Sequence, residues 1–183
     1  VLATADKIGT SLPSTRTDSN TIQITNLASH RLYKEVENTI IEKNGKIKYT
    51  VVYENKTEDP VPEFQLLDVL PYNGDNRETD FNGTYTLENI NIQQKVNGAV
   101  QSTNNLKLYT TNSTTVRNMT AKDDGIGTDN IWAEKTIGSS LNESVTGIAV
   151  KGQIAGKTRL EIEVTLQTQN NEAKDIYTNT AMA

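Results

Sequence analysis

Cysteine is absent from this sequence of 183 residues, and proline occurs four times, tryptophan once and histidine once. Without cysteine the chain has neither disulfides nor thiolate metal sites. Because His30 is the single histidine, the sequence offers no histidine-based catalysis and no His-rich metal site. No apolar run approaches the roughly 20 residues of a membrane-spanning helix. We therefore expect no cofactor and no membrane insertion of this segment.

Positively charged residues are fewer than negatively charged ones, with 18 lysines and arginines against 23 aspartates and glutamates. The net charge is -5 at pH 7, and no lysine and arginine cluster provides the basic surface that nucleic acids or anionic membranes bind. Apolar residues make up only 34% of the chain, whereas threonine and asparagine are abundant. This composition is typical of thin β-layers with wet outer faces. We expect an extracellular β-rich protein that does not bind nucleic acid.

Apolar and polar residues alternate with a period of two along much of the chain. The run 46–53 places Ile47, Tyr49, Val51 and Tyr53 on one side, and the run 158–169 alternates in the same way. Asn-Gly pairs at 44–45 and 97–98 are typical of hairpin turns. No segment longer than a turn or two favours a helix. The pattern predicts an all-β sandwich.

The remaining strands and loops follow from the same reasoning. Further strands are expected at 27–37, 63–70, 84–96, 106–111, 114–120, 144–151 and 176–182. The acidic segments 73–80 and 122–130 are predicted loops, and we expect the second to be the most exposed and mobile. Neither has the ligand spacing of a twelve-residue calcium loop, which favours solvated turns. Trp132, which follows the second loop, is expected to fill the core.

The first 28 residues do not resemble the start of a domain. Ser19-Asn20-Thr21-Ile22 echoes Thr178-Asn179-Thr180-Ala181 near the other end. Residues 1–28 are therefore either the terminal strand and linker of a preceding, similar domain or an N-terminal strand of the same domain. Residues 29–183 are expected to form one sandwich domain with a core of its own.

Three predicted strands carry a polar residue on the side that should face the core. These residues are Lys34 in the strand at 27–37, Asp68 in the strand at 63–70 and Asn179 in the strand at 176–182. Lysine and aspartate are almost never fully buried unless paired, and an unpartnered buried amide costs roughly 1–3 kcal/mol. A single cluster of the three residues would satisfy them all.

Each of the three residues also has an ordinary explanation. Lys34 could extend its amine to solvent at a strand edge, and Asp68 could cap the turn before Pro71. Asn179 could hydrogen-bond to neighbouring backbone. The coincidence of the three favours a shared role.

A lysine, an aspartate and an asparagine in one core can form an amide crosslink. An uncharged lysine amine can attack the side-chain carbonyl of asparagine, expel ammonia and leave a secondary amide. Burial favours the neutral forms of amines and carboxylic acids. A neutral acid can then polarise the carbonyl and transfer a proton to the leaving group, and fixed proximity lowers the barrier further. Because the reaction happens once per molecule, such a protein modifies itself and is not an enzyme.

These residues and their neighbours resemble a known family. Lys34, the run 45–51, the segment 67–71 and the closing segment 177–181 are similar to the CnaA-type isopeptide domains of Gram-positive surface adhesins and pilins. The similarity extends over residues 29–183. It implies an Ig-like sandwich with an intramolecular Lys–Asn isopeptide bond, in which Lys34 is the nucleophile, Asn179 the electrophile and Asp68 the catalytic acid.

The resemblance also implies a structural stalk domain. Such a domain is extracellular, belongs to a protein anchored to the cell wall of a Gram-positive bacterium, and has neighbouring domains of the same protein as partners. The sequence has no pilin motif for polymerisation, and 85–88 is not a convincing pilin glutamate box. The alternative is an adhesin module that binds a host protein or glycan through the loops 73–80 and 122–132. A hydrolase would need converging carboxylates or an activated nucleophile, which the sequence does not place.

Overall fold

The computed structural model describes residues 2–5, 16–19, 29–37, 39–123 and 125–183. The elements in chain order are β1 (Leu2–Ala5), β2 (Arg16–Ser19), β3 (His30–Val36), β4 (Lys46–Asn55), β5 (Val61–Val69), β6 (Thr84–Val96), β7 (Ala99–Gln101), β8 (Leu106–Thr111), the 3₁₀ helix η1 (Thr114–Asn118), β9 (Ala133–Lys135), β10 (Ser140–Glu143), β11 (Gly147–Ile154), β12 (Thr158–Gln169) and β13 (Thr180–Met182).

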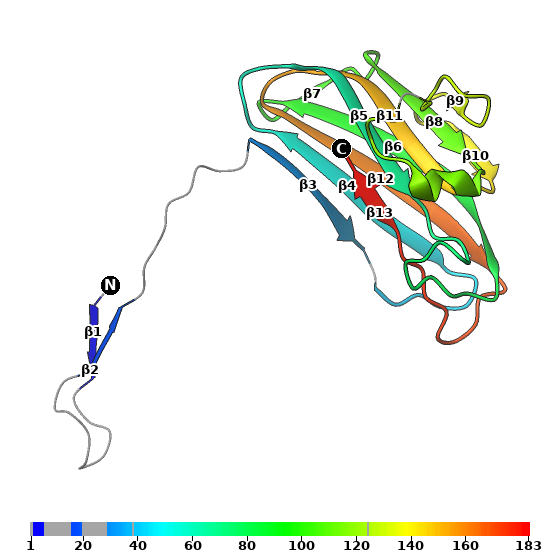
Figure 1. Ribbon diagram of the computed structural model, residues 1–183, viewed down its shortest axis with the longest axis horizontal. Helices are drawn as coiled ribbons and strands as arrows, with labels where there is room; N and C mark the ends of the chain where they lie inside the picture. The colour runs from blue at the N-terminus through cyan, green and yellow to red at the C-terminus, as the bar shows by residue number, and fades with distance from the viewer. Residues whose placement is uncertain (1, 6–15, 20–28, 38, 124) are drawn as a thin grey trace, which may run out of the picture.

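Two antiparallel sheets form a sandwich, as Figure 1 shows. One sheet has the order β10-β6-β12-β4-β3, with β7 paired to β6, and the other has the order β13-β5-β11-β8-β9. The prediction of an all-β sandwich is therefore confirmed. β1 and β2 pair with each other in a separate two-stranded sheet. Most of the connection from β2 to β3, at 20–28, lies outside the described residues, and so does the Asn20-Thr21-Ile22 part of the predicted repeat.

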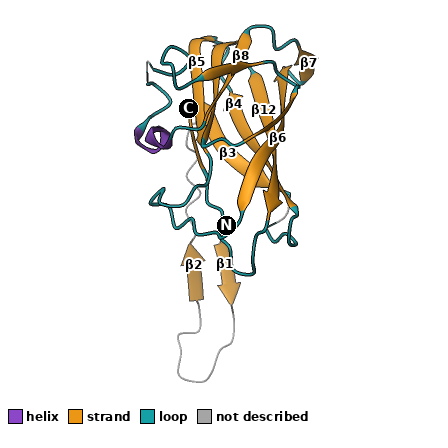
Figure 2. Ribbon diagram, turned by 90° about the vertical axis from the view of Figure 1, so that its right-hand side faces the viewer, coloured by secondary structure: helices purple, strands orange, loops and turns teal. Residues whose placement is uncertain are grey.

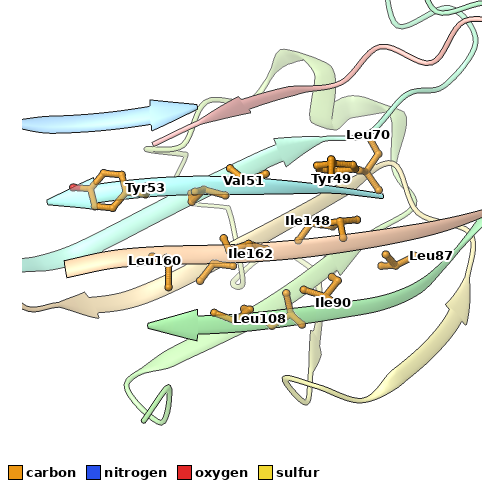
Figure 3. Packing of buried hydrophobic residues seen from close by; sticks show 14 of the residues in the cluster. Tyr49, Val51, Tyr53, Leu70, Leu87, Ile90, Leu108, Ile148, Leu160 and Ile162 are labelled. Atoms are coloured by element: carbon orange, nitrogen blue, oxygen red, sulfur yellow. The ribbon is translucent and has the colours of Figure 1, made fainter. Parts of the chain in front are cut away.

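The main core lies between the two sheets, where the inward side chains of β4 and β12 meet those of β5, β8 and β11 (Figure 3). Leu160, Ile162, Val164 and Leu166 are 0–1% exposed, as their alternation predicts. Each fully buried aliphatic side chain of this kind contributes about 2 kcal/mol relative to an exposed one. The hydrophobic effect therefore holds the two sheets face to face.

A second apolar cluster covers the outer face of the five-stranded sheet. Leu67 and Val69 of β5 and Ala149 of β11 point away from the main core and pack under the connection from β8 to β9. Trp132 belongs to this cluster and is 8% exposed, so the prediction that it is a core residue is confirmed. β5 and β11 are thus buried on both faces, which is typical of strands with continuous apolar runs.

Two predictions for this covering connection are wrong. The segment 114–120 contains the helix η1 in place of a strand, because the Ser113 side chain accepts a hydrogen bond from Thr115 N and caps a helical turn. Figure 2 shows η1 outside the sheets. The loop 122–130 is not exposed at its centre. Ile126 is fully buried and accepts a hydrogen bond from Lys151 Nζ at 2.8 Å, since the sheet beneath needs an apolar cover.

β3 and β13 are edge strands of opposite sheets and contact each other along one side of the sandwich (Figure 1). The predicted strand at 176–182 is shorter than expected: Thr180–Met182 pairs with β5, and Ile176 forms an isolated bridge with Asp80. Val36 shares the side of Lys34 in β3, the side predicted to face the core, but it is 52% exposed. It lies opposite the buried Tyr49 and borders a recess in place of packed side chains.

Within the described ranges, no helix has the length and apolar character needed to cross a membrane.

Candidate functional site

The contact between the two edge strands brings the sequence-predicted polar residues to one place. Lys34 comes from β3 and lies opposite Val51 of β4. Asp68 comes from β5 and lies opposite Ala181 of β13. Asn179 directly precedes β13 and shares the side of Ala181, so it is the diagonal neighbour of Asp68. Positions distant in the sequence thus meet because β3 and β13 close the same side of the sandwich.

Lys34 and Asp68 form a direct ion pair inside the protein. The Nζ atom of Lys34 lies 2.5 Å from Oδ1 of Asp68, and the side chains are 18% and 2% exposed. Burial lowers the pKa of the Lys34 amine, although the neighbouring Asp68 opposes this shift, and the positive charge of Arg77 lowers the pKa further. The surroundings therefore favour an uncharged amine at Lys34 more than water does.

Tyr49 of β4 completes the coordination of Asp68. Its hydroxyl donates a hydrogen bond of 2.7 Å to Oδ2 of Asp68, while Lys34 Nζ lies 4.8 Å from the centre of its ring. Burial raises the pKa of Tyr49 well above its usual range, and the carboxylate of Asp68 raises it further. Tyr49 therefore remains a protonated hydrogen-bond donor. Sequence reasoning assigned it only to the core; the signal was a buried phenol that needs a partner.

Asn179 has an amide nitrogen without a hydrogen-bond partner. Its Nδ2 is buried and makes no hydrogen bond of good geometry with the residues that the structure describes. The Asn179 carboxamide lies beside the Tyr49 hydroxyl, where it opposes the rise in the pKa of Tyr49 that burial and Asp68 cause. A buried polar group left unpaired costs about 1–3 kcal/mol. Among the buried side-chain atoms without a partner in the described residues, this one is the amide nitrogen that lies beside Tyr49 and Asp68.

A second polar network supports the site from the predicted loop 73–80. Arg77 donates hydrogen bonds of 2.6 Å to the carbonyl oxygens of Val69 and Leu70, directly after Asp68, and lies 2.7 Å from Asp75. Asp75 also accepts from Thr79, at 2.7 Å. Sequence reasoning missed Arg77, because nothing in a polar loop indicates that a side chain reaches back to a strand.

A recess with a volume of about 700 Å³ opens beside Tyr49 and Asn179. It lies between Val36 with the segment 39–41, at and beyond the end of β3, and the segment 171–179, which precedes β13. Its walls are largely apolar, and Ile40 and Ile176 stand 88% and 52% exposed. The recess gives a small molecule released at Asn179 a route to solvent.

The geometry of the site suits amide chemistry better than metal chemistry. In the described part of the chain, no three His, Cys, Asp or Glu side chains gather as metal ligands would. His30 hydrogen-bonds instead to the Tyr53 hydroxyl at 2.9 Å. The site contains the Lys34 amine, whose pKa is lowered and which is bound to Asp68. It also contains the unpaired carboxamide of Asn179, beside the Tyr49 hydroxyl that binds Asp68. These are the groups required for condensation of an amine with an amide.

Comparisons with known proteins assign the chain to no family. No family model and no curated protein matches the chain. Among solved structures, it is similar to the CBM3a-L domain with flanking linkers from scaffoldin cipA of the Clostridium thermocellum cellulosome, at 14% identity and a TM-score of 0.42, covering 84% of this chain and 85% of that one. A family 3a carbohydrate binding module from the same scaffolding has 11% identity and a TM-score of 0.39, over 83% and 93% of the two chains. Similarity at this level carries no argument about function.

Proposed function

We propose that residues 29–183 form a structural stalk domain of a bacterial surface protein, crosslinked within itself by an isopeptide bond between Lys34 and Asn179. The observation that carries the proposal is the buried pair of Lys34 and Asp68 at 2.5 Å, in the same cluster as the unpaired amide of Asn179. Burial supplies an amine of lowered pKa, and Asp68 is the acid that receives and returns the proton.

The bond would join the two sheets along one side of the sandwich. Lys34 lies on an edge strand of one sheet, and Asn179 precedes an edge strand of the other. By the loop-entropy estimate for disulfides, a crosslink that closes a loop of this length is worth about 5 kcal/mol. The bond would also raise the force needed to extend the domain, because a pull on its ends would load a covalent bond in place of a ladder of hydrogen bonds.

The surroundings of the domain are part of the same proposal. The resemblance of the segments around Lys34, Asp68 and Asn179 to CnaA-type domains supports an extracellular protein anchored to the cell wall of a Gram-positive bacterium. Neighbouring domains of the same protein are then the partners, and the domain itself catalyses no repeated reaction.

Single-molecule stretching tests the stalk function directly. The domain is pulled between handles attached before residue 29 and after residue 183, and the Lys34→Ala variant serves as control. We expect the wild type to resist extension between residues 34 and 179 at forces that unfold the control completely. Equal contour lengths released by the two proteins would overturn the proposal.

A second candidate function is a ligand-binding adhesin module, which the recess favours. Its exposed Ile40 and Ile176 are apolar side chains that a host protein or glycan could cover. The predicted binding loops have contacts of their own: Arg117 of η1 donates to Gly74 O at 2.9 Å, and Ile126 is buried. A solid-phase screen against matrix proteins and glycans, with Ile40→Asp as the matched variant, distinguishes this function. Reproducible binding that the variant loses supports it.

A further inference from the structure

The hydrogen bonds around Asp68 raise the question of which group protonates the departing nitrogen. Oδ1 of Asp68 faces Lys34 Nζ at 2.5 Å, and Oδ2 receives the Tyr49 hydroxyl at 2.7 Å. Both carboxyl oxygens are therefore occupied by groups other than Asn179. The hydroxyl of Tyr49 stands between Asp68 and the Asn179 carboxamide, and Tyr49 and Asn179 both line the recess.

We propose that Tyr49 is a catalytic residue of the crosslinking reaction, whose hydroxyl delivers a proton from Asp68 to the departing Nδ2 of Asn179. This inference rests on the proposed function. It assigns to the phenol a step that would otherwise belong to the carboxyl group alone.

With Lys34 uncharged and Asp68 neutral, the acid proton on Oδ2 points to the oxygen of Tyr49. Nδ2 of Asn179 can accept the hydroxyl hydrogen of Tyr49 only after attack has made the amide carbon tetrahedral, because the nitrogen lone pair is delocalised until then. The Nζ atom attacks the Asn179 carbonyl carbon, and a bond forms between them. As the bond from that carbon to Nδ2 breaks, Tyr49 gives its hydrogen to Nδ2 and takes the hydrogen from Oδ2. Lys34 loses one hydrogen to Oδ1, so ammonia leaves and both Asp68 and Tyr49 end in neutral form.

The surroundings keep Tyr49 fit for this role. It is 6% exposed, and its burial together with Asp68 raises its pKa, so the hydroxyl keeps its proton between transfers. A phenol that stays protonated does not act as the general base of the reaction. It can only relay a proton between the two groups that hydrogen-bond to it. The recess beside Tyr49 and Asn179 then lets ammonia leave the site.

Tyr85 provides a matched control for the loss of a buried hydroxyl. Its hydroxyl donates to Pro71 O and Val145 O at 2.7 and 2.8 Å, and the side chain is 7% exposed. Neither acceptor bonds to Lys34, Asp68 or Asn179, although Pro71 also lines the recess. Tyr85→Phe and Tyr49→Phe thus remove hydroxyl groups of similar burial, and only the second touches the proposed proton path.

The rate of crosslinking is measured during cell-free synthesis, in samples quenched with denaturant at timed intervals and analysed by intact mass. We expect Tyr49→Phe to slow the loss of ammonia by about 100-fold or more, which is typical of removing a general acid. Tyr85→Phe should react at the wild-type rate. If Tyr49→Phe also reacts at the wild-type rate, Tyr49 has no part in proton transfer. If the wild type itself loses no ammonia, the proposed function fails together with this inference.

Fluorinated tyrosines at position 49 separate proton transfer from a purely structural role, and they keep the hydroxyl should Tyr49→Phe fold poorly. The series is incorporated during the same synthesis, so that the acidity of the phenol increases while its shape changes little. We expect the logarithm of the rate to vary steadily with phenol acidity. A rate that is independent of acidity would show that the hydroxyl only positions Asp68, and would overturn the proposal.

Discussion

Two buried carboxylates of this protein lie close together and have opposite surroundings. Asp75 accepts hydrogen bonds from Tyr72 N, Arg77 and Thr79, all within the segment 72–79. Asp68 binds Lys34 and Tyr49 from two other strands and has the unpaired amide of Asn179 nearby. The first network is local and gives its carboxylate several donors, whereas the second is assembled from distant parts of the chain. Each contains one buried nitrogen without a partner among the described residues, Arg77 Nε in the first and Asn179 Nδ2 in the second.

The difference indicates what each network is for. A carboxylate that accepts several hydrogen bonds from its own loop stabilises one conformation of that loop. In the second cluster, the amine of lowered pKa and the unpaired amide both raise the free energy of the fold. A covalent bond between them would remove both groups and so lower that free energy. Variants in the two clusters should therefore separate stability from crosslinking.

Replacing Asp68 by asparagine should have the largest effect. The variant would lack the acid of the reaction, and the amine of Lys34 would remain buried without its counter-ion, which costs about 3–5 kcal/mol in comparable buried pairs. We expect no loss of ammonia in the intact mass, and a guanidinium midpoint well below that of the wild type. An Asp68→Asn protein that still forms the crosslink would contradict the role given to this carboxyl group.

Replacing Lys34 by methionine should have a smaller effect on stability. This variant also lacks the crosslink, and so loses about 5 kcal/mol of loop-closure stabilisation. It leaves no unpaired ammonium. Asp68 loses its counter-ion, but the hydrogen bond from Tyr49 remains and offsets part of that loss. The denaturation midpoint should fall between those of the wild type and Asp68→Asn. A midpoint equal to that of the wild type would mean that no crosslink stabilises the parent protein.

Replacing Asp75 by asparagine should lower stability without affecting the crosslink. Burial alone raises the pKa of Asp75, but the hydrogen bonds from Thr79, Arg77 and Tyr72 outweigh it, so the pKa is lower than usual. A lowered carboxyl pKa stabilises the fold at neutral pH, and this contribution disappears as the pH falls through the folded-state pKa. We expect a loss of about 2 kcal/mol at pH 7.

The pH series provides the check on Asp75. The difference in melting temperature between wild type and Asp75→Asn should be constant near neutral pH and should shrink below about pH 4, the ordinary range of an aspartate. The intact mass should show the same loss of ammonia in both proteins. A difference that grows on acidification would contradict the sign of the pKa shift.

Replacing Tyr85 by phenylalanine should have the smallest effect. The change removes the hydrogen bonds to Pro71 O and Val145 O, for which we expect a loss of about 1 kcal/mol. Thermal unfolding monitored by circular dichroism measures it, and the crosslink should form completely. A variant that loses the crosslink would show that the site depends on general packing more than on its own groups.

The sequence predicted the features that depend on local pattern. The alternation in 158–169 predicted β12 and its buried side, and Trp132 was correctly placed in the core. The sequence pattern identified Lys34, Asp68 and Asn179 because charged and amide side chains are unusual on the apolar side of a strand. Parity within a strand was enough to find these residues, although it could not give the distances between them.

The features that the sequence did not reveal depend on contacts between distant segments. Nothing in the run around Tyr49 indicates that its hydroxyl meets Asp68, and a polar loop does not indicate that Arg77 returns to the end of β5. The helix η1 was predicted as a strand because its threonines favour strands, whereas the cap from Ser113 decides its local structure. The exposure of Val36 depends on the recess that it borders.

A covalent bond between Lys34 and Asn179 changes the intact mass of the denatured protein. The wild type is compared with Lys34→Ala and Asn179→Ala, each relative to the mass calculated from its own sequence. We expect the wild type to be lighter by one ammonia, neither variant to be lighter, and a proteolytic digest to contain one peptide joining residues 34 and 179. A wild-type protein of full mass would contradict the self-crosslinking mechanism, and the sandwich would then need another explanation for its buried lysine and unpaired amide.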